Sequence, residues 1–428
     1  MKNQAPQYIH YMYSYPHKTA YRTFDNPVNL PAYLEKVAGK KTSLYFHIPF
    51  CRYKCGFCNL FSQQGYDKVN VDAYLDTMYR QALQLSQWAE NLIFDAFSIG
   101  GGTPLILTAG QLDRLFEIAA LFGVYPEKVF TSIETSPDCT DRNVLQLLKD
   151  RGVKRLSIGI QSFRPEELIH IKRKTSFCTI KEALDVIRQI NFPQFNMDLI
   201  YGIEGQTVAS FLYSIEMALE YNPTELFLYP LYVRNGVRIS AKAGNETLFA
   251  MYNAGRDALL RQGFKQTSMR RFVKGDTTDL EYSCGDEIML SCGCGGRSYI
   301  GNLHYATYYA VNQQEIKAVI DDYIQTADFT KIIHGYLLSE EEVQRRYIIK
   351  NLMYYRGIDK SDYRQRFGDD LPVSYFDRFI TEGIIEDKDG FIRLTSDGMA
   401  YSDDIGHLFI SPSVRRHMDN YKKTKRFF

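Results

Sequence analysis

Short apolar runs alternate with longer stretches of helical spacing along the first half of the chain. The runs are five or six residues long, which suits buried strands: Leu44–Ile48, Phe94–Ile99, Val129–Ile133, Arg155–Ile160, Phe195–Ile200 and Glu225–Tyr229. The stretches between them have the periodicity of amphipathic helices: Val71–Trp88, Thr108–Leu121, Asp141–Asp150, Ile180–Ile190 and Thr207–Leu219. Strands joined by helix-length crossovers pair in parallel. The pattern therefore predicts six βα units around a parallel sheet, which could be open or partly closed into a barrel.

The pattern changes after Tyr232. Residues 233–335 mix turns with one expected helix, Thr247–Gln262, and a segment rich in glycine and cysteine at 291–298. We expect an N-terminal arm, the βα array, a connecting segment on the substrate side and a C-terminal module. Their ranges are 1–40, 41–232, 233–335 and 336–428.

The C-terminal module has the pattern of a winged helix. Ser339 caps an expected helix at Glu340–Tyr354, and two shorter helical stretches follow. The residues Ile384–Leu394 alternate about the turn Lys388-Asp389-Gly390, which predicts a hairpin. Acidic residues dilute the cations of this module, so packing against a catalytic domain is favoured over DNA binding.

Composition excludes several classes of function. The chain has 428 residues, with 51 Lys and Arg against 50 Asp and Glu, so no net field attracts nucleic acid or a membrane surface. Its apolar runs stop well short of the ~20 residues that span a bilayer. The first residues lack the apolar core of a signal peptide. We therefore expect a cytoplasmic protein.

Three of the eight cysteines, Cys51, Cys55 and Cys58, lie on one short segment directly after the first expected strand. Three thiolates can hold three irons of a cubane cluster and leave the fourth iron open for a small molecule. Zinc sites normally use four protein ligands. His47 could supply a fourth ligand, but it lies on the strand itself.

The Cys-x₃-Cys-x₂-Cys spacing resembles that of the radical S-adenosylmethionine (SAM) superfamily. The longer sequence Tyr45-Phe-His-Ile-Pro-Phe-Cys51 resembles the branch typified by oxygen-independent coproporphyrinogen III oxidase and the related haem chaperone. This resemblance implies a partial (β/α)₆ barrel and a [4Fe–4S] cluster held by Cys51, Cys55 and Cys58. It also implies reductive cleavage of SAM, followed by hydrogen abstraction from a small-molecule substrate. The reductant would be flavodoxin or ferredoxin.

The ends of the later strands support a binding site without reference to the cysteines. Polar residues and three glycines follow consecutive strands, and the carboxyl ends of parallel strands meet on one face. The resemblance implies that Tyr45 lies near the cluster as a catalytic residue. It further implies that the following residues bind SAM: Gly100, Gly101, Gly102, Thr103, Glu134, Gln161, Arg173 and Asp198.

Two departures from the branch leave the substrate open. Coproporphyrinogen oxidase has a further cysteine where this chain has Leu60, and the haem chaperone has a His-Asn-x-x-Tyr-Trp sequence where this chain has Tyr282–Leu290. The segments Tyr15–Tyr21 and Ile200–Thr207 resemble those of a group of coproporphyrinogen-oxidase-like proteins. We expect a radical SAM oxidoreductase or transferase. A methyltransferase that uses two SAM molecules and a haem-binding carrier are the alternatives.

Two further segments each have two interpretations. The tyrosine-rich N-terminal arm could close over a substrate, although a strand or irregular arm that packs on the core is favoured. The second cysteine group, Cys284, Cys292 and Cys294, could hold an auxiliary cluster, although small side chains that fill a tight glycine turn are favoured.

Overall fold

The computed structural model describes residues 4–8, 11–12, 14–233, 237–239, 242–275 and 288–421. Its centre is a run of six parallel strands in sequence order, as predicted. These strands are β2 (Lys41–Ile48), β3 (Ile93–Gly101), β4 (Phe130–Thr135), β5 (Arg155–Gln161), β6 (Gln194–Tyr201) and β7 (Glu225–Pro230). The crossover helices are α2 (Lys68–Ala89), α3 (Ala109–Ala120), α4 (Arg142–Asp150), α6 (Phe177–Ile190) and α7 (Val208–Leu219). A short helix that the sequence did not predict, α5 (Pro165–His170), precedes α6.

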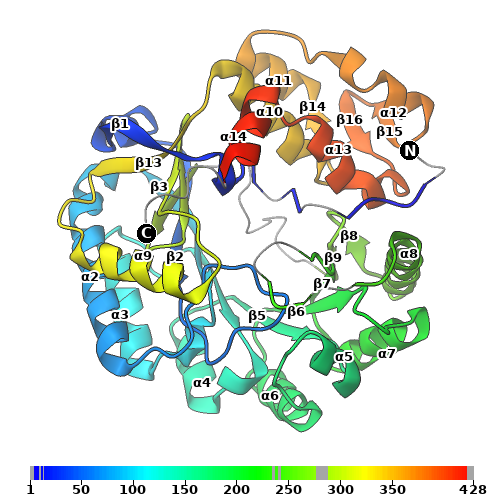
Figure 1. Ribbon diagram of the computed structural model, residues 1–428, viewed down its shortest axis with the longest axis horizontal. Helices are drawn as coiled ribbons and strands as arrows, with labels where there is room; N and C mark the ends of the chain where they lie inside the picture. The colour runs from blue at the N-terminus through cyan, green and yellow to red at the C-terminus, as the bar shows by residue number, and fades with distance from the viewer. Residues whose placement is uncertain are drawn as a thin grey trace.

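Side-chain caps explain why the crossover helices begin where they do. Thr108 and Thr207 each accept a hydrogen bond from the backbone three residues on, and residues 111 and 210 complete capping boxes. The side chain of Asp141 caps α4 in the same way. The helices bury apolar faces against the sheet and surround it in Figure 1. The apolar core therefore lies between the helices and the outer face of the sheet, and polar residues remain on the inner face.

The sheet continues beyond the six strands on both sides. Next to β2 it adds β10 (Ile288–Cys292), β11 (Arg297–Ile300), β12 (Leu303–Ala306), β13 (Lys331–Leu337) and β1 (Arg22–Asn29). Next to β7 it adds β9 (Arg271–Val273) and β8 (Lys265–Gln266). The two edge strands are β1 and β8, so the barrel does not close. Part of the expected N-terminal arm and much of the connecting segment therefore belong to the barrel sheet.

Four helices cover these additions or follow them. They are α1 (Pro31–Lys36), α8 (Asn245–Arg261), α9 (Gln313–Gln325) and α10 (Glu340–Leu352). Ser339 caps α10, as predicted, because its side chain accepts a hydrogen bond from Glu342 N. In the described parts of the chain, no helix is long and apolar enough to cross a membrane.

The C-terminal module has the helices and hairpin of a winged-helix-like fold. After α10 come β14 (Ile358–Asp359), α11 (Lys360–Phe367), α12 (Asp377–Thr381), β15 (Ile385–Lys388) and β16 (Phe391–Leu394). Asp389 and Gly390 form the predicted turn with φ of 54° and 83°. Two helices complete the chain: α13 (Ser402–Leu408) and α14 (Pro412–Asn420). This module lies to the upper right of the barrel in Figure 1.

The N-terminal residues run between the C-terminal module and the barrel (Figure 1). Gln7 N and Met12 N donate hydrogen bonds to the carboxylates of Asp404 and Asp403, at 2.8 and 3.0 Å. The ring of Tyr11 lies 3.8 Å from the Arg270 guanidinium. These described residues pack on the core, which agrees with the favoured interpretation of the arm.

Candidate functional site

The strand ends bring the predicted residues together at one end of the barrel. The cysteine segment follows β2 directly, and beside it Gly100 and Gly101 end β3 and Gly102 comes next. Gly101 N donates a hydrogen bond of 3.1 Å to the Glu134 carboxylate at the end of β4. The Cys51 thiol lies 3.5 Å from the Thr103 hydroxyl. The cysteine loop, the glycines, Thr103 and Glu134 therefore form one continuous surface.

The glycines of β3 are required by close approach. A Cβ atom on Gly100 would lie 2.9 Å from the Glu134 carboxylate, and one on Gly102 would lie 2.4 Å from Phe50 O. Gly101 has a φ of 116°, which L side chains rarely adopt. The triplet thus lets the cysteine loop and β4 meet across the end of β3.

Backbone hydrogen bonds fix the cysteine loop from both sides. Gly56 N donates to Ile171 O at 2.8 Å, and Arg238 N donates to Gly56 O at 2.7 Å. A Cβ atom on Gly56 would lie 2.8 Å from the Ile239 side chain, so no larger residue fits here. Sequence reasoning missed Gly56, whose only signal is its place inside the triad.

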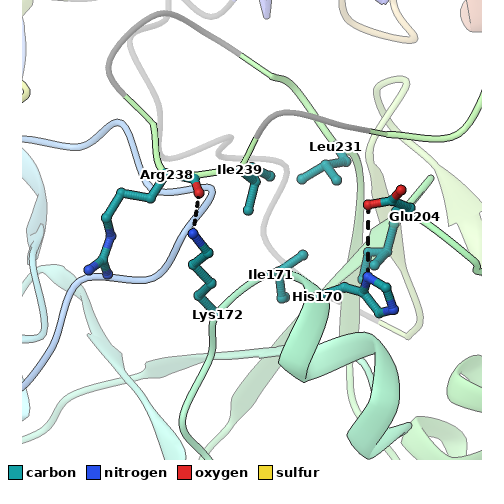
Figure 2. Close-up of a pocket in the computed structure, with 8 residues that line it drawn as sticks. His170, Ile171, Lys172, Glu204, Leu231, Arg238 and Ile239 are labelled. Atoms are coloured by element: carbon teal, nitrogen blue, oxygen red, sulfur yellow. Dashed lines mark hydrogen bonds and ion pairs between the residues drawn. The ribbon is translucent and has the colours of Figure 1, made fainter.

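A small pocket of about 160 Å³ lies beside this attachment (Figure 2). Lys172 Nζ donates a hydrogen bond of 2.6 Å to Arg238 O across it. His170 and Glu204 face each other at 3.9 Å on its far side. Lys172 therefore helps to hold the Arg238 segment, whose backbone binds Gly56 of the cysteine loop.

The thiols of the triad have polar neighbours that a metal-binding loop needs. Burial raises the pKa of Cys51 to about 12, and hydrogen bonds from Thr103 and Ser62 oppose this rise. Burial also raises the pKa of Cys55, and the nearby Arg173 charge opposes it. Arg173 Nη1 lies 3.5 Å from the Cys55 sulfur. Cations and hydroxyls at these distances stabilise thiolates, which are the form that binds iron.

The donor set fits a cluster better than a single metal ion. Among the described residues, no three His, Cys, Asp or Glu side chains are arranged to hold one ion. A cubane cluster separates its thiolate ligands, because each binds a different iron. The thiols of Cys55 and Cys58 still lie near enough to Cys51 for their charges to raise its pKa. Three cysteines without a fourth protein ligand therefore fit a [4Fe–4S] cluster with one open iron.

His47 is engaged elsewhere. Its Nδ1 atom lies 3.0 Å from the Tyr45 hydroxyl, and its Nε2 atom lies 3.0 Å from Phe61 O. Both ring nitrogens therefore have partners within the protein, and the idea of a histidine ligand to the cluster loses its support.

Arg173 differs from its neighbours. Lys172 and Lys174 are exposed, whereas Arg173 is buried. Its Nη2 donates a hydrogen bond to Gly159 O, and its Nε has no hydrogen-bond partner among the described residues. A buried guanidinium with an unused donor beside the triad is suited to an anionic ligand. The sequence alone could not separate Arg173 from a run of solvated cations.

The two carboxylates of the site face the inside of the barrel. The surrounding wall raises the pKa of Glu134 to about 7, although its side chain is exposed to the open interior, and the hydrogen bond from Gly101 N opposes the rise. Burial raises the pKa of Asp198 to about 6, and Asn196 opposes it. Asn196 Nδ2 donates a hydrogen bond of 2.8 Å to Asp198 Oδ1. Asn196 was missed, although its place two residues before Asp198 puts both on one face of β6.

Gln161 ends β5 in a strained conformation. It has a φ of 74°, and its side-chain nitrogen occupies the space where a Cβ atom on Gly159 would stand, at 2.6 Å. A non-glycine residue in this region is uncommon and is frequently found at functional sites. The geometry is consistent with the predicted role of Gln161.

The base of the barrel contains a charged cluster that the sequence did not reveal. Glu225 is fully buried and receives hydrogen bonds of 2.8 Å from both Arg155 and Arg271. Removing one partner from a buried, hydrogen-bonded ion pair is strongly destabilising. The cluster fixes β5, β7 and β9 to one another below the site.

The second cysteine group lies behind the site rather than in it. Cys292 and Cys294 are completely buried, and burial raises the pKa of both thiols. Cys284 lies outside the described residues. Two buried thiols in a glycine turn agree with the favoured interpretation, in which small side chains fill a tight space.

Comparisons with known proteins now add to this geometry. The family "Radical SAM superfamily" matches residues 45–218, and the family "HemN C-terminal domain" matches residues 338–401. The chain is 26% identical over 430 residues to the oxygen-independent coproporphyrinogen III oxidase of Escherichia coli K12, covering 91% of each. It is 25% identical over 383 residues to the heme chaperone HemW of Bacillus subtilis, covering 86% of this chain and 99% of that protein.

The solved structure of coproporphyrinogen III oxidase (HemN) from Escherichia coli has the same fold. Its TM-score is 0.79 at 23% identity, over 94% of this chain and 97% of that one. The open parallel barrel and the C-terminal module both lie within this match. The chain therefore contains a radical SAM domain at residues 45–218, followed by a HemN C-terminal domain at residues 338–401.

Proposed function

We propose that this protein is a radical SAM enzyme in which Cys51, Cys55 and Cys58 hold a [4Fe–4S] cluster. The observation that carries the proposal is the continuous surface formed by the triad, the β3 glycines and Glu134. Among the residues that the structure describes, it combines three thiols that have no fourth protein ligand, a buried donor on Arg173 that has no hydrogen-bond partner, and two carboxylates in the barrel. When bound, the reduced cluster supplies one electron to SAM, whose carbon–sulfur bond then breaks to give methionine and a 5′-deoxyadenosyl radical.

The residues of this chain divide the binding of SAM between them. Glu134 and the backbone of the β3 glycines suit the amino group of the methionyl part, and the Arg173 guanidinium suits its carboxylate. Asp198, oriented by Asn196, suits the ribose hydroxyls, because a carboxylate accepts two hydrogen bonds. Gln161 and Thr103 complete the polar lining. Tyr45 lies on β2 beside this surface and is proposed to face the substrate.

The chain needs an electron donor and a substrate. The low potential of such clusters makes flavodoxin or ferredoxin the proposed reductant. The substrate stays open, because the relatives include both coproporphyrinogen oxidases and haem chaperones. Leu60 replaces a cysteine of the oxidases, so oxidative decarboxylation of a porphyrinogen is one candidate reaction among hydrogen abstractions.

Anaerobic reconstitution tests the proposal. We expect about four irons and four sulfides per chain, and formation of methionine and 5′-deoxyadenosine after reduction in the presence of SAM. S-adenosylhomocysteine beside 5′-deoxyadenosine would identify a methyltransferase with two SAM molecules. Haem absorbance with little turnover would identify a carrier. Full cluster occupancy without any SAM binding would contradict the proposal.

A further inference from the structure

His47 and Tyr45 lie two residues apart on β2, so their side chains share the inner face of the strand. The Tyr45 hydroxyl lies 3.0 Å from His47 Nδ1, and His47 Nε2 lies 3.0 Å from Phe61 O. His47 is 5% exposed. The three groups therefore form a fixed chain from the loop after the triad to the phenol.

The chemistry of these groups sets the direction of the hydrogen bonds. A backbone carbonyl can only accept, so His47 Nε2 must carry a hydrogen and donate it to Phe61 O. Burial lowers the pKa of His47 to about 3, and the charges of Lys18 and Arg297 lower it further. The ring is therefore neutral, its Nδ1 atom has a lone pair, and Tyr45 must donate its hydroxyl hydrogen to that atom.

We propose that His47 is a positioning residue that makes Tyr45 a hydrogen-bond acceptor toward the barrel interior. With its only hydrogen committed to His47, the phenol oxygen offers lone pairs to any further partner. The group of the substrate that meets Tyr45 would then be an N–H or O–H donor. This last step rests on the proposed function, whereas the direction of the hydrogen bond rests on the contacts and the burial of His47.

The glycines around His47 support this role. A Cβ atom on Gly101 would lie 2.7 Å from His47 Cε1, and one on Gly295 would lie 2.7 Å from His47 Nε2. A Cβ atom on Gly293 would lie 2.5 Å from His47 O, which already accepts a hydrogen bond of 2.7 Å from Tyr74. Both glycine-rich segments of the chain therefore converge on one imidazole. The second segment forms the back of its cradle.

Nitrogen NMR of the full chain labelled with ¹⁵N-histidine tests the direction of the hydrogen bonds directly. A His47→Gln variant assigns the signal by its disappearance. We expect a neutral ring at pH 7 with hydrogen on Nε2 and none on Nδ1. A hydrogen on Nδ1, in a neutral or a charged ring, would make Tyr45 the acceptor from His47 and would overturn the proposal.

A matched pair of variants tests the positioning role. His47→Asn keeps an oxygen near the place of Nδ1, whereas His47→Gln keeps only a group near the place of Nε2. The carbon–oxygen stretch of Tyr45, isolated by isotope-edited infrared difference against Tyr45→Phe, reports whether the phenol donates or accepts. We expect the Tyr45 stretch at the frequency of a hydrogen-bond donor in the natural chain and in His47→Asn. In His47→Gln we expect the stretch to leave that frequency. An unchanged frequency in His47→Gln would contradict the proposal.

A glycine pair tests the cradle. Gly295→Ala should shift the His47 nitrogen signals, because the added methyl group meets the ring. Gly110→Ala is the control, since nothing lies within 4 Å of its added Cβ atom. An unshifted His47 signal in folded Gly295→Ala would remove the second glycine segment from the proposal. Neither spectrum requires the cluster, so failure of cluster assembly would contradict the proposed function and leave this test intact.

Discussion

The chain places cysteines close together twice, with different results. Cys51, Cys55 and Cys58 lie on a loop at the mouth of the barrel, where Thr103 contacts the Cys51 sulfur and Arg173 contacts the Cys55 sulfur. Cys292 and Cys294 lie at and just beyond the end of β10 and are completely buried. Burial raises the pKa of both thiols, and a hydrogen bond with Tyr74 and the charge of Lys18 oppose the rise for Cys294 only. Spacing alone therefore does not make a metal site, because reactive thiolates also need a partly exposed position in which a ligand can reach them.

The glycines of the two segments differ in the same way. Gly56 lets the loop of the triad pass between the Ile171 and Ile239 segments, which fixes the ligands from outside. Gly293 and Gly295 let the second segment approach His47 from behind. Gly56 thus helps to position the cysteine ligands, whereas Gly293 and Gly295 make room for His47, which contacts the site through Tyr45.

The largest expected effect separates the two cysteine groups. Replacing any one of Cys51, Cys55 and Cys58 by Ala should remove most of the iron and all detectable 5′-deoxyadenosine after anaerobic reconstitution, because each of the three thiols binds a different iron of the proposed cluster. Cys292→Ala and Cys294→Ala are the controls and should keep both. A single triad variant with full iron content and full cleavage would refute the cluster assignment.

The next effect tests whether protein side chains at the mouth of the barrel contribute to SAM binding in addition to the cluster. Asp198→Asn should keep the cluster and weaken SAM binding roughly tenfold, ~1.5 kcal/mol, as for loss of a hydrogen bond to a charged group. Equilibrium dialysis with reconstituted protein measures the affinity, and iron analysis verifies the cluster. Unchanged affinity would mean that Asp198 does not contact the cofactor.

Much of the barrel could be predicted because its signals are local. Each of the six strands is a short apolar run, and caps such as Thr108 and Asp141 mark the helix starts. The extension of the sheet beyond these six strands could not be predicted in this way. Strand β1 is mostly exposed, contains Pro27 and pairs with β13 some three hundred residues later, so nothing near it in the sequence reveals its partner.

The site shows the same division. The triad and the strand-end residues were predictable because they follow their strands directly. The contact of Arg173 with Cys55, the attachment of Gly56 and the pairing of Asn196 with Asp198 depend on three-dimensional packing. His47 was noted as a potential metal ligand, and only its contacts with Tyr45 and Phe61 reveal its other task.

A smaller effect compares the two glycine positions. Gly56→Ala and Gly293→Ala should each destabilise the fold by about 1–3 kcal/mol, because the added methyl group meets packed atoms in both. Gly293 has in addition a φ of 91° that Ala adopts with strain. Only Gly56→Ala should also reduce iron incorporation, since only Gly56 lies inside the triad. Thermal unfolding and iron analysis measure the two effects. An equal loss of iron in both variants would contradict the different roles given to Gly56 and Gly293.

The smallest effect concerns the pH dependence of stability, and it compares Glu134 at the mouth of the barrel with the buried Cys294. The folded chain raises the pKa of Glu134 from 4.5 to about 7. Between these values the unfolded chain has released a proton that the folded chain keeps, so the stability of the cofactor-free protein should fall as the pH rises through this range. Water in the open barrel screens the carboxylate, so we expect about 1 kcal/mol from this group.

In the Glu134→Gln variant, the stability should fall less between pH 5 and pH 7 than it does in the natural chain. Unfolding midpoints at pH 5, 6, 7 and 8 measure the difference. Asp198, whose pKa is raised from 3.8 to about 6, should cause the loss of stability that remains in this variant at the lower end of the pH range. Cys294→Ala is the matched control, because burial raises the pKa of that thiol to about 12 and it keeps its proton throughout. If Glu134→Gln followed the natural chain at every pH, the carboxylate would be fully hydrated, and the barrel mouth would not differ from open solvent at that point.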